Sequence, residues 1–141
     1  MKFNKLIPEL RVSNLIASLN FYTVLLNFKI EYERKEKKFA FISYEGSQIM
    51  LEENSNPNWN TGDLDYPFGR GINFQIDVSN VSLLFERLKQ GKYPIKVQPH
   101  ENWYNQDNKL LGVKEFLVMD PDGYLLRFSQ SIGTKDADAA F

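Results

Sequence analysis

The sequence predicts an α+β fold of two tandem βαβββ modules, which form a curved mixed sheet with a concave groove and carry their helices on the outer face. A Val-Ser-Asn motif occurs twice, at Val12 and Val78, which are 66 residues apart. Each copy follows a strand-like segment and precedes a segment with helical apolar spacing, and three further strand-like segments follow. One helix covers only one face of a four-stranded sheet, so two modules side by side would leave a groove.

The first module spans about residues 5–53. It begins with a strand within residues 5–12. The helix that follows is indicated by apolar residues at helical spacing, namely Leu15, Leu19, Tyr22 and Leu26. A Ser or Asn just before this run can cap the helix, because its side-chain oxygen accepts a free backbone N–H. Three strands are then expected at residues 28–34, 38–45 and 47–53, with the last two joined at Glu45-Gly46.

The second module repeats this order over residues 71–131. A strand at 71–78 precedes a helix, whose apolar residues are Val81, Leu84, Phe85 and Leu88. The remaining strands are expected at residues 93–99, 112–120 and 124–130. The segment Asp-Pro-Asp-Gly at 120–123 supplies the turn before the last strand, because Pro presets one dihedral angle and Gly accepts a positive φ.

Two long segments have no counterpart in the repeat. The turn glycines Gly46 and Gly123 are 77 residues apart, so the second module contains an insertion of eleven residues, which we expect to be a polar loop at 100–110. A linker loop at 54–70 joins the modules, and each loop contains one tryptophan, Trp59 or Trp103. Long loops inside a compact domain are often functional. Residues 1–131 are therefore expected to form one domain, and 132–141 a frayed tail.

Composition excludes several classes of function. The 141 residues include 17 basic and 18 acidic side chains without a basic stripe, so nucleic acid is not an expected partner. No apolar run is long enough for a membrane helix, and the first residues lack the apolar core of a signal peptide, so a cytoplasmic location is expected. Aromatic residues reach 14%, more than a small core usually needs, which indicates that some line a pocket.

The two modules, together with the segments Arg11–Ile30 and Asp120–Phe128, resemble the vicinal-oxygen-chelate superfamily. The similarity is greatest to its glyoxalase/bleomycin-resistance/dioxygenase branch, and within that to bleomycin-resistance-like proteins. It covers roughly residues 5–131. These motifs are fairly specific for the fold but weak for function, because the superfamily includes isomerases, dioxygenases, thiol transferases and drug-binding proteins.

The resemblance implies four positions where superfamily enzymes hold a divalent metal, one in the first and one in the last strand of each module. In this sequence they are occupied by Ile7, Met50, Asn73 and Arg127. Isoleucine has no donor atom, and arginine is a permanent cation. Methionine is a soft ligand that suits hard cations poorly. His100, the single histidine, lies outside all four positions, so the sequence predicts no metal and no cofactor.

Arg127 has two interpretations. It points to solvent or pairs with a nearby carboxylate, or it faces the groove and binds an anionic or carbonyl group of a ligand. Glu52 or Glu53 could neutralise it, and strand register decides which of these two faces inward. No nucleophile motif is present, and paired carboxylates such as Asp120 and Asp122 are expected at turns and rims.

Drug-sequestering members of the family are dimers with two clefts at their interface, often with exchange of the N-terminal strand. The resemblance therefore implies a homodimer that clamps a flat ligand between aromatic side chains and meets its cationic parts with acidic ones. The candidate ligand-binding residues are Phe39, Phe41, Met50, Glu52, Trp59, Phe68, Asn73, Trp103, Tyr104 and Arg127. For Phe39 and Phe41 the alternative is packing under a helix, and for the tryptophans it is pinning a loop to the body.

The leading hypothesis is a metal-free protein that sequesters a bleomycin-like antibiotic and catalyses no reaction. The alternative is a glyoxalase- or dioxygenase-type lyase or oxidoreductase with a displaced metal site. A third hypothesis is a module that binds a partner protein.

Overall fold

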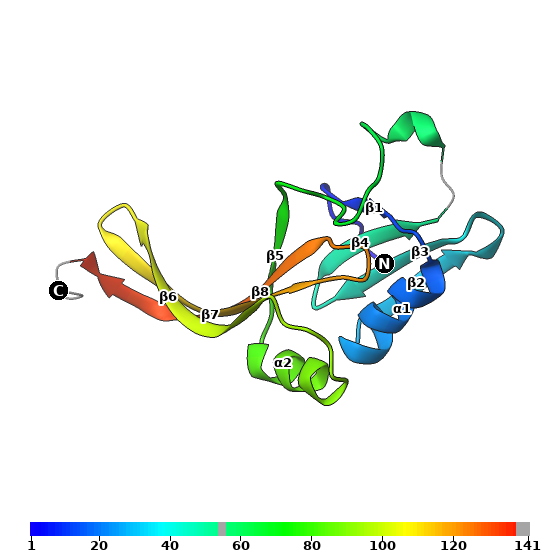
Figure 1. Cartoon of the computed structure of the whole chain (residues 1–141). Coiled ribbons are helices and arrows are strands. Elements are labelled where there is room, and N and C mark those ends of the chain that lie inside the picture. Colours follow the sequence, from blue (N-terminus) through cyan, green and yellow to red (C-terminus); the bar gives the residue numbers. More distant parts are fainter. Residues whose placement is uncertain (54–55, 138–141) are drawn as a thin grey trace. The chain divides into compact units, whose positions relative to one another are not determined.

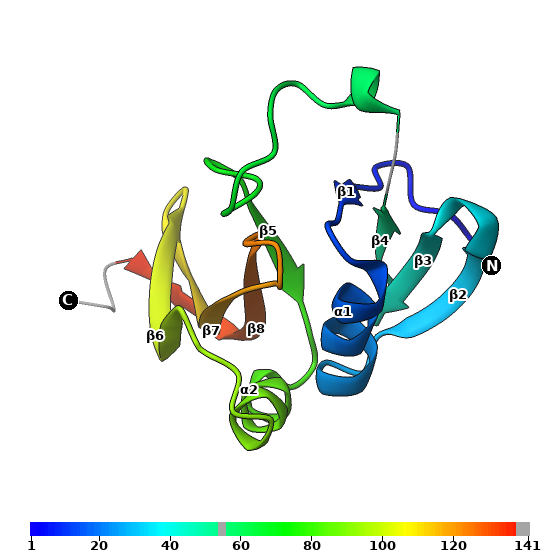
Figure 2. The same ribbon diagram turned by 45° about the vertical axis from the view of Figure 1, so that its right-hand side comes forward.

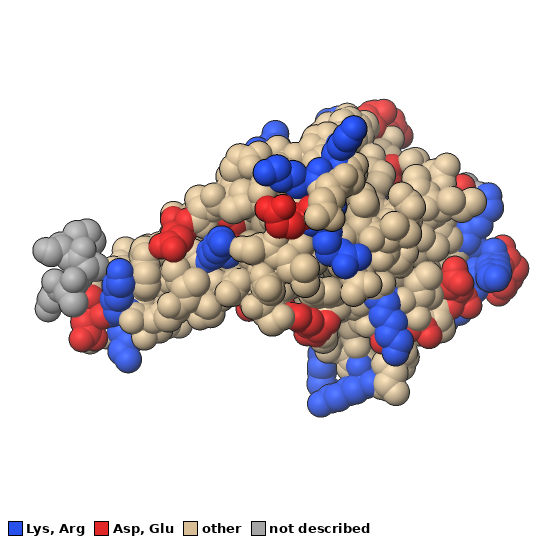
Figure 3. Space-filling view, turned by 90° about the horizontal axis from the view of Figure 1, so that it is seen from below, with Lys and Arg blue, Asp and Glu red and all other residues tan. Residues whose placement is uncertain are grey.

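The computed structural model describes residues 1–53 and 56–137, which form two compact units. The first unit is Met1–Gly71 with Asp120–Tyr124, and the second contains Ile72–Met119 and the strand that begins at Leu125. Within the described residues, no helix combines the length and the apolar character needed to cross a membrane. On the face shown in Figure 3, basic and acidic side chains are interspersed among the others.

The first unit contains a four-stranded sheet with the order β1-β4-β3-β2 (Figure 1). β1 is parallel to β4, and the other neighbouring strands are antiparallel. The strands are β1 (Glu9–Arg11), β2 (Lys29–Arg34), β3 (Phe39–Tyr44) and β4 (Ser47–Glu52). Two short 3₁₀ helices follow β2 and β4, namely η2 (Lys35–Lys37) and η3 (Pro57–Trp59).

Helix α1 (Leu15–Leu19) follows β1 and continues directly into a π-helical turn, η1 (Asn20–Leu25). Asn14 caps α1, because its side-chain oxygen accepts the N–H of Ala17 at 3.1 Å. Figure 2 shows α1 beside the sheet of the first unit. The core under it comes from alternate strand positions, including Ala40, Ile42 and Leu51, which are fully buried.

The second unit repeats this arrangement, with the sheet order β5-β8-β7-β6 and β5 parallel to β8. Its elements are β5 (Asn73–Asp77), α2 (Val81–Gln90), β6 (Val97–Gln106), β7 (Lys109–Met119) and β8 (Leu125–Asp136). Asn80 caps α2 by accepting the N–H of Leu83. Under α2, the Phe116 ring stacks on Phe128 and meets the Phe85 ring edge-on. The predicted α+β class and its two βαβββ modules are confirmed.

The predicted loop at 100–110 is wrong. β6 runs to Gln106 and β7 begins at Lys109, so a tight turn at Asp107 and Asn108 replaces the loop. Asp107 adopts a φ of 54°, which an aspartate tolerates in such turns. The polar composition was misleading because the outer part of this hairpin carries polar side chains in regular strand pairing.

The frayed tail expected at 132–141 is also wrong for its first part. Residues 132–136 belong to β8, and the extended β7 supplies their partners, with Gly112 opposite Gly133 and Lys109 opposite Asp136. Residues 138–141 lie outside the described part of the chain. The first strand is shorter than expected, since β1 begins only at Glu9, after Pro8, which has no N–H to donate to a ladder.

The turn Asp120–Tyr124 joins β7 to β8 but belongs by its contacts to the first unit. The carboxylate of Asp120 is 2% exposed and accepts the Tyr22 hydroxyl at 2.8 Å. It also accepts the backbone N–H groups of Asp122 and Tyr124. Asp122 in turn accepts the backbone N–H and the hydroxyl of Ser13, just before α1. Burial raises the pKa of Asp120 to about 6, although the hydrogen bonds from Tyr22 and the backbone oppose this rise.

This raised pKa predicts a pH-dependent stability that Asp120→Asn removes. The folded protein binds the Asp120 proton more tightly than the unfolded chain, whose pKa is near 3.8. The contribution of this group to the free energy of unfolding therefore falls as pH rises from 4 to 6, by about 2–3 kcal/mol. Urea unfolding at several pH values checks this. Across that range Asp120→Asn should gain stability relative to the native chain as pH rises, and a constant difference would contradict the prediction.

Candidate ligand-binding site

The face of the first sheet opposite α1 carries two rows of cross-strand neighbours. Strand pairing aligns Tyr32, Phe41, Met50 and Glu9 in one row, and Arg34, Phe39, Glu52 and Arg11 in the next. Residues in register on neighbouring strands share a face, so these eight side chains lie together. The intervening positions, such as Ala40 and Leu51, point toward the helix. Phe39 and Phe41 are therefore on the face away from α1, which decides against packing under a helix.

A cavity of about 600 Å³ lies on this face. Its volume falls within the range of small-molecule sites, roughly 300–1,000 Å³. Four of the predicted site residues line it: Phe39, Met50, Glu52 and Trp59. The other lining residues are Glu9, Tyr32, Arg34, Glu36, Lys37 and Asn56. Trp59 comes from η3 and is 71% exposed, so much of its ring is available for contact.

The aromatic side chains of this face are already stacked. The Tyr32 and Phe41 rings are nearly parallel, at 13° and 5.2 Å between centroids, and Phe3 meets Phe41 edge-on at 5.4 Å. The guanidinium of Arg34 lies over Phe39 at 4.7 Å and over Tyr32 at 5.5 Å. A cation over a ring face is attracted by the ring quadrupole. These contacts order the aromatic wall without any ligand.

Strand register also decides which of Glu52 and Glu53 faces the cavity. Glu52 lines the cavity, and Arg11 lies 3.6 Å from its carboxylate and 3.5 Å from that of Glu9. Glu53 serves the other face, where it accepts the backbone N–H of Leu15 at 2.8 Å and pairs with Lys38. Glu52 is thus the inward glutamate, and its carboxylate pairs with Arg11.

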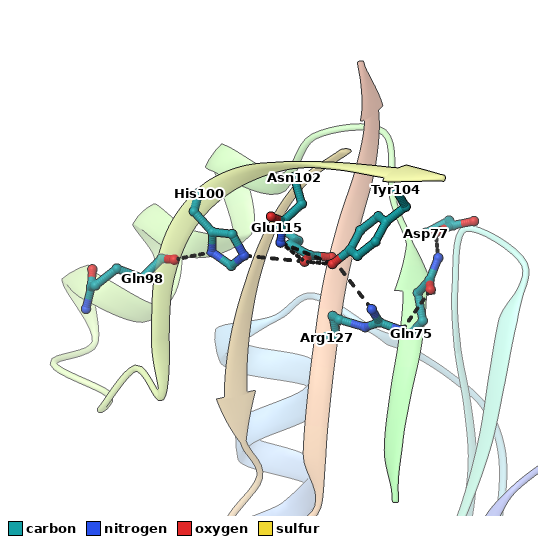
Figure 4. A network of polar contacts seen from close by, with 8 residues as sticks. All are labelled: Gln75, Asp77, Gln98, His100, Asn102, Tyr104, Glu115 and Arg127. Atoms are coloured by element: carbon teal, nitrogen blue, oxygen red, sulfur yellow. Dashed lines mark hydrogen bonds and ion pairs between the residues drawn. The ribbon is translucent and has the colours of Figure 1, made fainter. Parts of the chain in front are cut away.

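The corresponding face of the second sheet is polar (Figure 4). Its centre is Glu115 on β7, which is only 3% exposed. One carboxylate oxygen, Oε1, accepts the Tyr104 hydroxyl at 2.5 Å and the Asn102 amide at 3.1 Å, and the His100 Nε2 lies 3.3 Å from it. Arg127 lies 3.9 Å from the other oxygen, and it donates to Gln75 at 3.0 Å. The nearby-carboxylate interpretation of Arg127 therefore fits, with Glu115 as the carboxylate.

These contacts control the protonation of the cluster. Burial alone raises the pKa of Glu115, but hydrogen bonds from Tyr104 and Asn102 and the charges of Arg127 and His100 outweigh it, so the pKa is lowered. The pKa of Tyr104 is raised, mainly because its hydroxyl donates to Glu115. Glu115 is thus a buried, ionised carboxylate whose partners come from two strands, β6 and β8.

Glu115, His100 and Asn102 were missed as site residues. His100, Asn102 and Tyr104 alternate along β6, so they share one face, and Glu115 is the cross-strand partner of His100. The alternation is present in the sequence, but it carries no meaning until the segment is known to be a strand.

Trp103 lies on the opposite face of β6 from Tyr104. Its ring packs closely against Gly112, where an added Cβ would lie 2.5 Å from the nearest ring carbons. The ammonium of Lys135 covers the ring at 3.9 Å. Within the second unit, Trp103 and Arg127 therefore do not share a face.

Two other predicted residues, Phe68 and Asn73, are not among the residues that line the cavity. Phe68 packs edge-on against Tyr124, and its backbone N–H donates to Asp122. Asn73 is exposed at the start of β5, opposite Leu125.

Comparison with known proteins identifies the fold family. The model of the Glyoxalase/Bleomycin resistance protein/Dioxygenase superfamily matches residues 4–128. The chain belongs to this superfamily. Bleomycin resistance proteins from Geobacillus stearothermophilus and Staphylococcus aureus are each 26% identical to it over 135 residues, covering 89% of this chain and 96% of theirs. The resemblance expected from the sequence motifs is confirmed.

Solved structures agree with this fold. TioX from Micromonospora sp. ML1 superposes with a TM-score of 0.70 at 16% identity, over 92% of this chain and 100% of that chain. A glyoxalase/bleomycin resistance protein/dioxygenase from Alicyclobacillus acidocaldarius gives a TM-score of 0.64 at 17% identity, over 92% of both chains. At these identities the likeness shows the fold alone.

The residues at the superfamily's four metal positions do not fit a divalent metal. Met50 lies on the aromatic face and lines the cavity, and Arg127 places a guanidinium between Glu115 and Gln75. Ile7 offers no donor, which leaves the Asn73 amide. Among the described residues, no group of three or more His, Cys, Asp or Glu is arranged to hold a metal ion.

The Glu115 cluster predicts a specific effect of Tyr104→Phe. Loss of the hydroxyl removes one donor, so the pKa of Glu115 rises toward its ordinary value. A lowered pKa stabilises the folded state above the unfolded value, and this stability is lost as pH falls through the folded pKa. At pH 7 the variant should therefore lose about 1 kcal/mol of unfolding free energy, and less at pH 3.

Urea unfolding at both pH values measures this difference. Tyr66→Phe is the matched control, because Tyr66 is 61% exposed and its hydroxyl makes no hydrogen bond with the described residues. An equal loss at pH 7 and pH 3 would show that the hydroxyl does not act through the charge of Glu115.

Proposed function

We propose that this protein is a metal-free, cytoplasmic binding protein of bleomycin-resistance type, which sequesters an aromatic, antibiotic-like ligand. The observation that supports this best is the cavity on the first sheet. It is lined by aromatic side chains, and Met50 stands in it where superfamily enzymes place a metal ligand. Carboxylates also line this cavity, but among the described residues no group of three or more is arranged to hold a metal ion, and the aromatic surfaces suit a flat molecule.

The ligand is held by stacking on the aromatic wall. Trp59, which is 71% exposed, offers the most open ring at the cavity, Tyr32 lines it as well, and Phe39, at 3% exposed, supports the wall from beneath Arg34. Each aromatic pair contributes roughly 0.5–1.5 kcal/mol beyond burial. Glu9 and Glu52 lie at the same cavity and meet a cationic part of the ligand, in competition with Arg11. Phe41, Phe68, Asn73, Trp103, Tyr104 and Arg127 do not line this cavity, and their role as ligand contacts remains a prediction.

The active form is a homodimer with a binding groove at its interface. This follows from the family, whose drug-binding members are dimers, and exposed apolar side chains before β1 are compatible with it. Phe3 is 53% exposed and Leu6 is 86% exposed. Light scattering should give twice the 16.5 kDa mass of one chain, and a monomer at micromolar concentration would contradict the dimer.

Isothermal titration with metal-free bleomycin tests the function. We expect saturable binding that does not change in excess chelator, and a weakening of about threefold to tenfold in Trp59→Leu, because one stacking surface is lost. Leu64→Ala is the control, since it alters an exposed residue of the same loop that does not line the cavity.

Two outcomes would contradict this proposal. No heat and no thermal shift at high bleomycin concentration would refute the antibiotic as ligand. A stoichiometric metal in the purified protein, with a turnover that chelators abolish, would favour the lyase or oxidoreductase.

A further inference from the structure

Two acidic side chains of the cavity, Glu9 and Glu52, have an ion-pair partner, but one of its basic side chains, Arg34, has none among the described residues. Glu9 and Glu52 both pair with Arg11, whose side chain is only 11% exposed. Arg34, by contrast, forms no ion pair with a carboxylate of the described residues, and its five N–H donors have no hydrogen-bond partner among them. Arg11 thus neutralises part of the negative charge of Glu9 and Glu52, whereas no carboxylate of the described residues neutralises Arg34.

The chain around Arg34 strengthens this imbalance. Residues 34–38 read Arg-Lys-Glu-Lys-Lys, four basic side chains and one acidic. Three of them, Arg34, Glu36 and Lys37, line the cavity. Lys38 pairs with Glu53 on the other face of the sheet. The rim formed by the end of β2 and by η2 therefore carries a net positive charge toward the cavity.

Arg34 is also held in position. Its guanidinium lies over the rings of Phe39, its cross-strand neighbour, and Tyr32, two residues earlier on β2. A guanidinium on an aromatic face keeps its N–H edge free, and that edge matches a carboxylate with two parallel hydrogen bonds. A flat ligand with an oxyanion can thus bind Arg34 with that group while its ring stacks beside Trp59.

We propose that the ligand of this cavity is a planar aromatic molecule that carries a carboxylate or a similar oxyanion, and that Arg34 binds this group. The inference rests on the proposed binding function and specifies the chemistry of its ligand. It adds an anionic group to the aromatic and cationic parts considered above. Arg34 is then the residue that selects among flat ligands by charge.

Titration calorimetry with 2-naphthoate and 2-naphthamide tests this inference, because the two probes share a ring and differ in charge. The native protein should bind naphthoate about fivefold more tightly, as expected for a charge-assisted contact in a partly open site. Arg34→Gln should reduce this preference to about one. Lys29→Gln should retain it, because Lys29 lies on the same strand, carries the same charge and does not line the cavity.

Each outcome decides the proposal. Equal binding of the two probes by the native protein, or a preference unchanged in Arg34→Gln, would overturn the role of Arg34 and leave the bleomycin titration unaffected. Failure of both probes to bind would overturn the cavity as a site for small aromatic anions. Circular dichroism of each variant confirms that it is folded before its affinity is compared.

Discussion

A single helix can cover only one face of a four-stranded sheet, and every feature of the candidate site depends on this constraint. In the first unit, alternate strand residues such as Ala40 and Leu51 are buried under α1. The residues between them must then lie on the other face, where Tyr32, Phe39 and Met50 line a cavity. The pleat of the strands thus directs one set of side chains toward α1 and the other toward the cavity, although Phe39 and Phe41 of the second set are themselves buried.

The sheet face opposite the helix differs in chemistry between the two modules. On the first sheet this face is aromatic. Arg11 forms ion pairs there with Glu9 and Glu52, and the guanidinium of Arg34 lies over the rings of Tyr32 and Phe39. On the second sheet the equivalent face is a polar network around Glu115, whose pKa is lowered in spite of burial. Arg127, which stands where the family places a metal carboxylate, is part of that network. A guanidinium is a permanent cation with donors only, so Arg127 itself offers no ligand to a metal ion.

Local patterns were sufficient to predict the two modules. The Val-Ser-Asn repeat, the helical spacing of apolar residues and the glycine turns are all encoded within short segments. Long-range pairing was not predictable in the same way. The strand at 132–136 exists because β7 is long enough to pair with it, and residues 100–106 form a strand although their composition is that of a loop.

The site was predicted in part for the same reason. Phe39, Met50, Glu52 and Trp59 line one cavity, as their types suggested, but register was needed to choose Glu52 over Glu53. Glu115 escaped notice because its importance arises from partners on other strands. Asp120 was expected at a turn or at the rim of the site. Its carboxylate is instead buried, where Tyr22 and the backbone supply its hydrogen bonds.

The central claim is that the uncovered face of the first sheet holds an aromatic ligand without the help of a metal. Fluorine NMR of protein labelled with 5-fluorotryptophan tests it directly, since Trp59 and Trp103 are the only two tryptophans. A saturating aromatic ligand such as 2-naphthoate should shift the Trp59 resonance, and the shift should be identical in the presence of excess EDTA. An unmoved Trp59 resonance, or a shift that EDTA abolishes, would contradict the account.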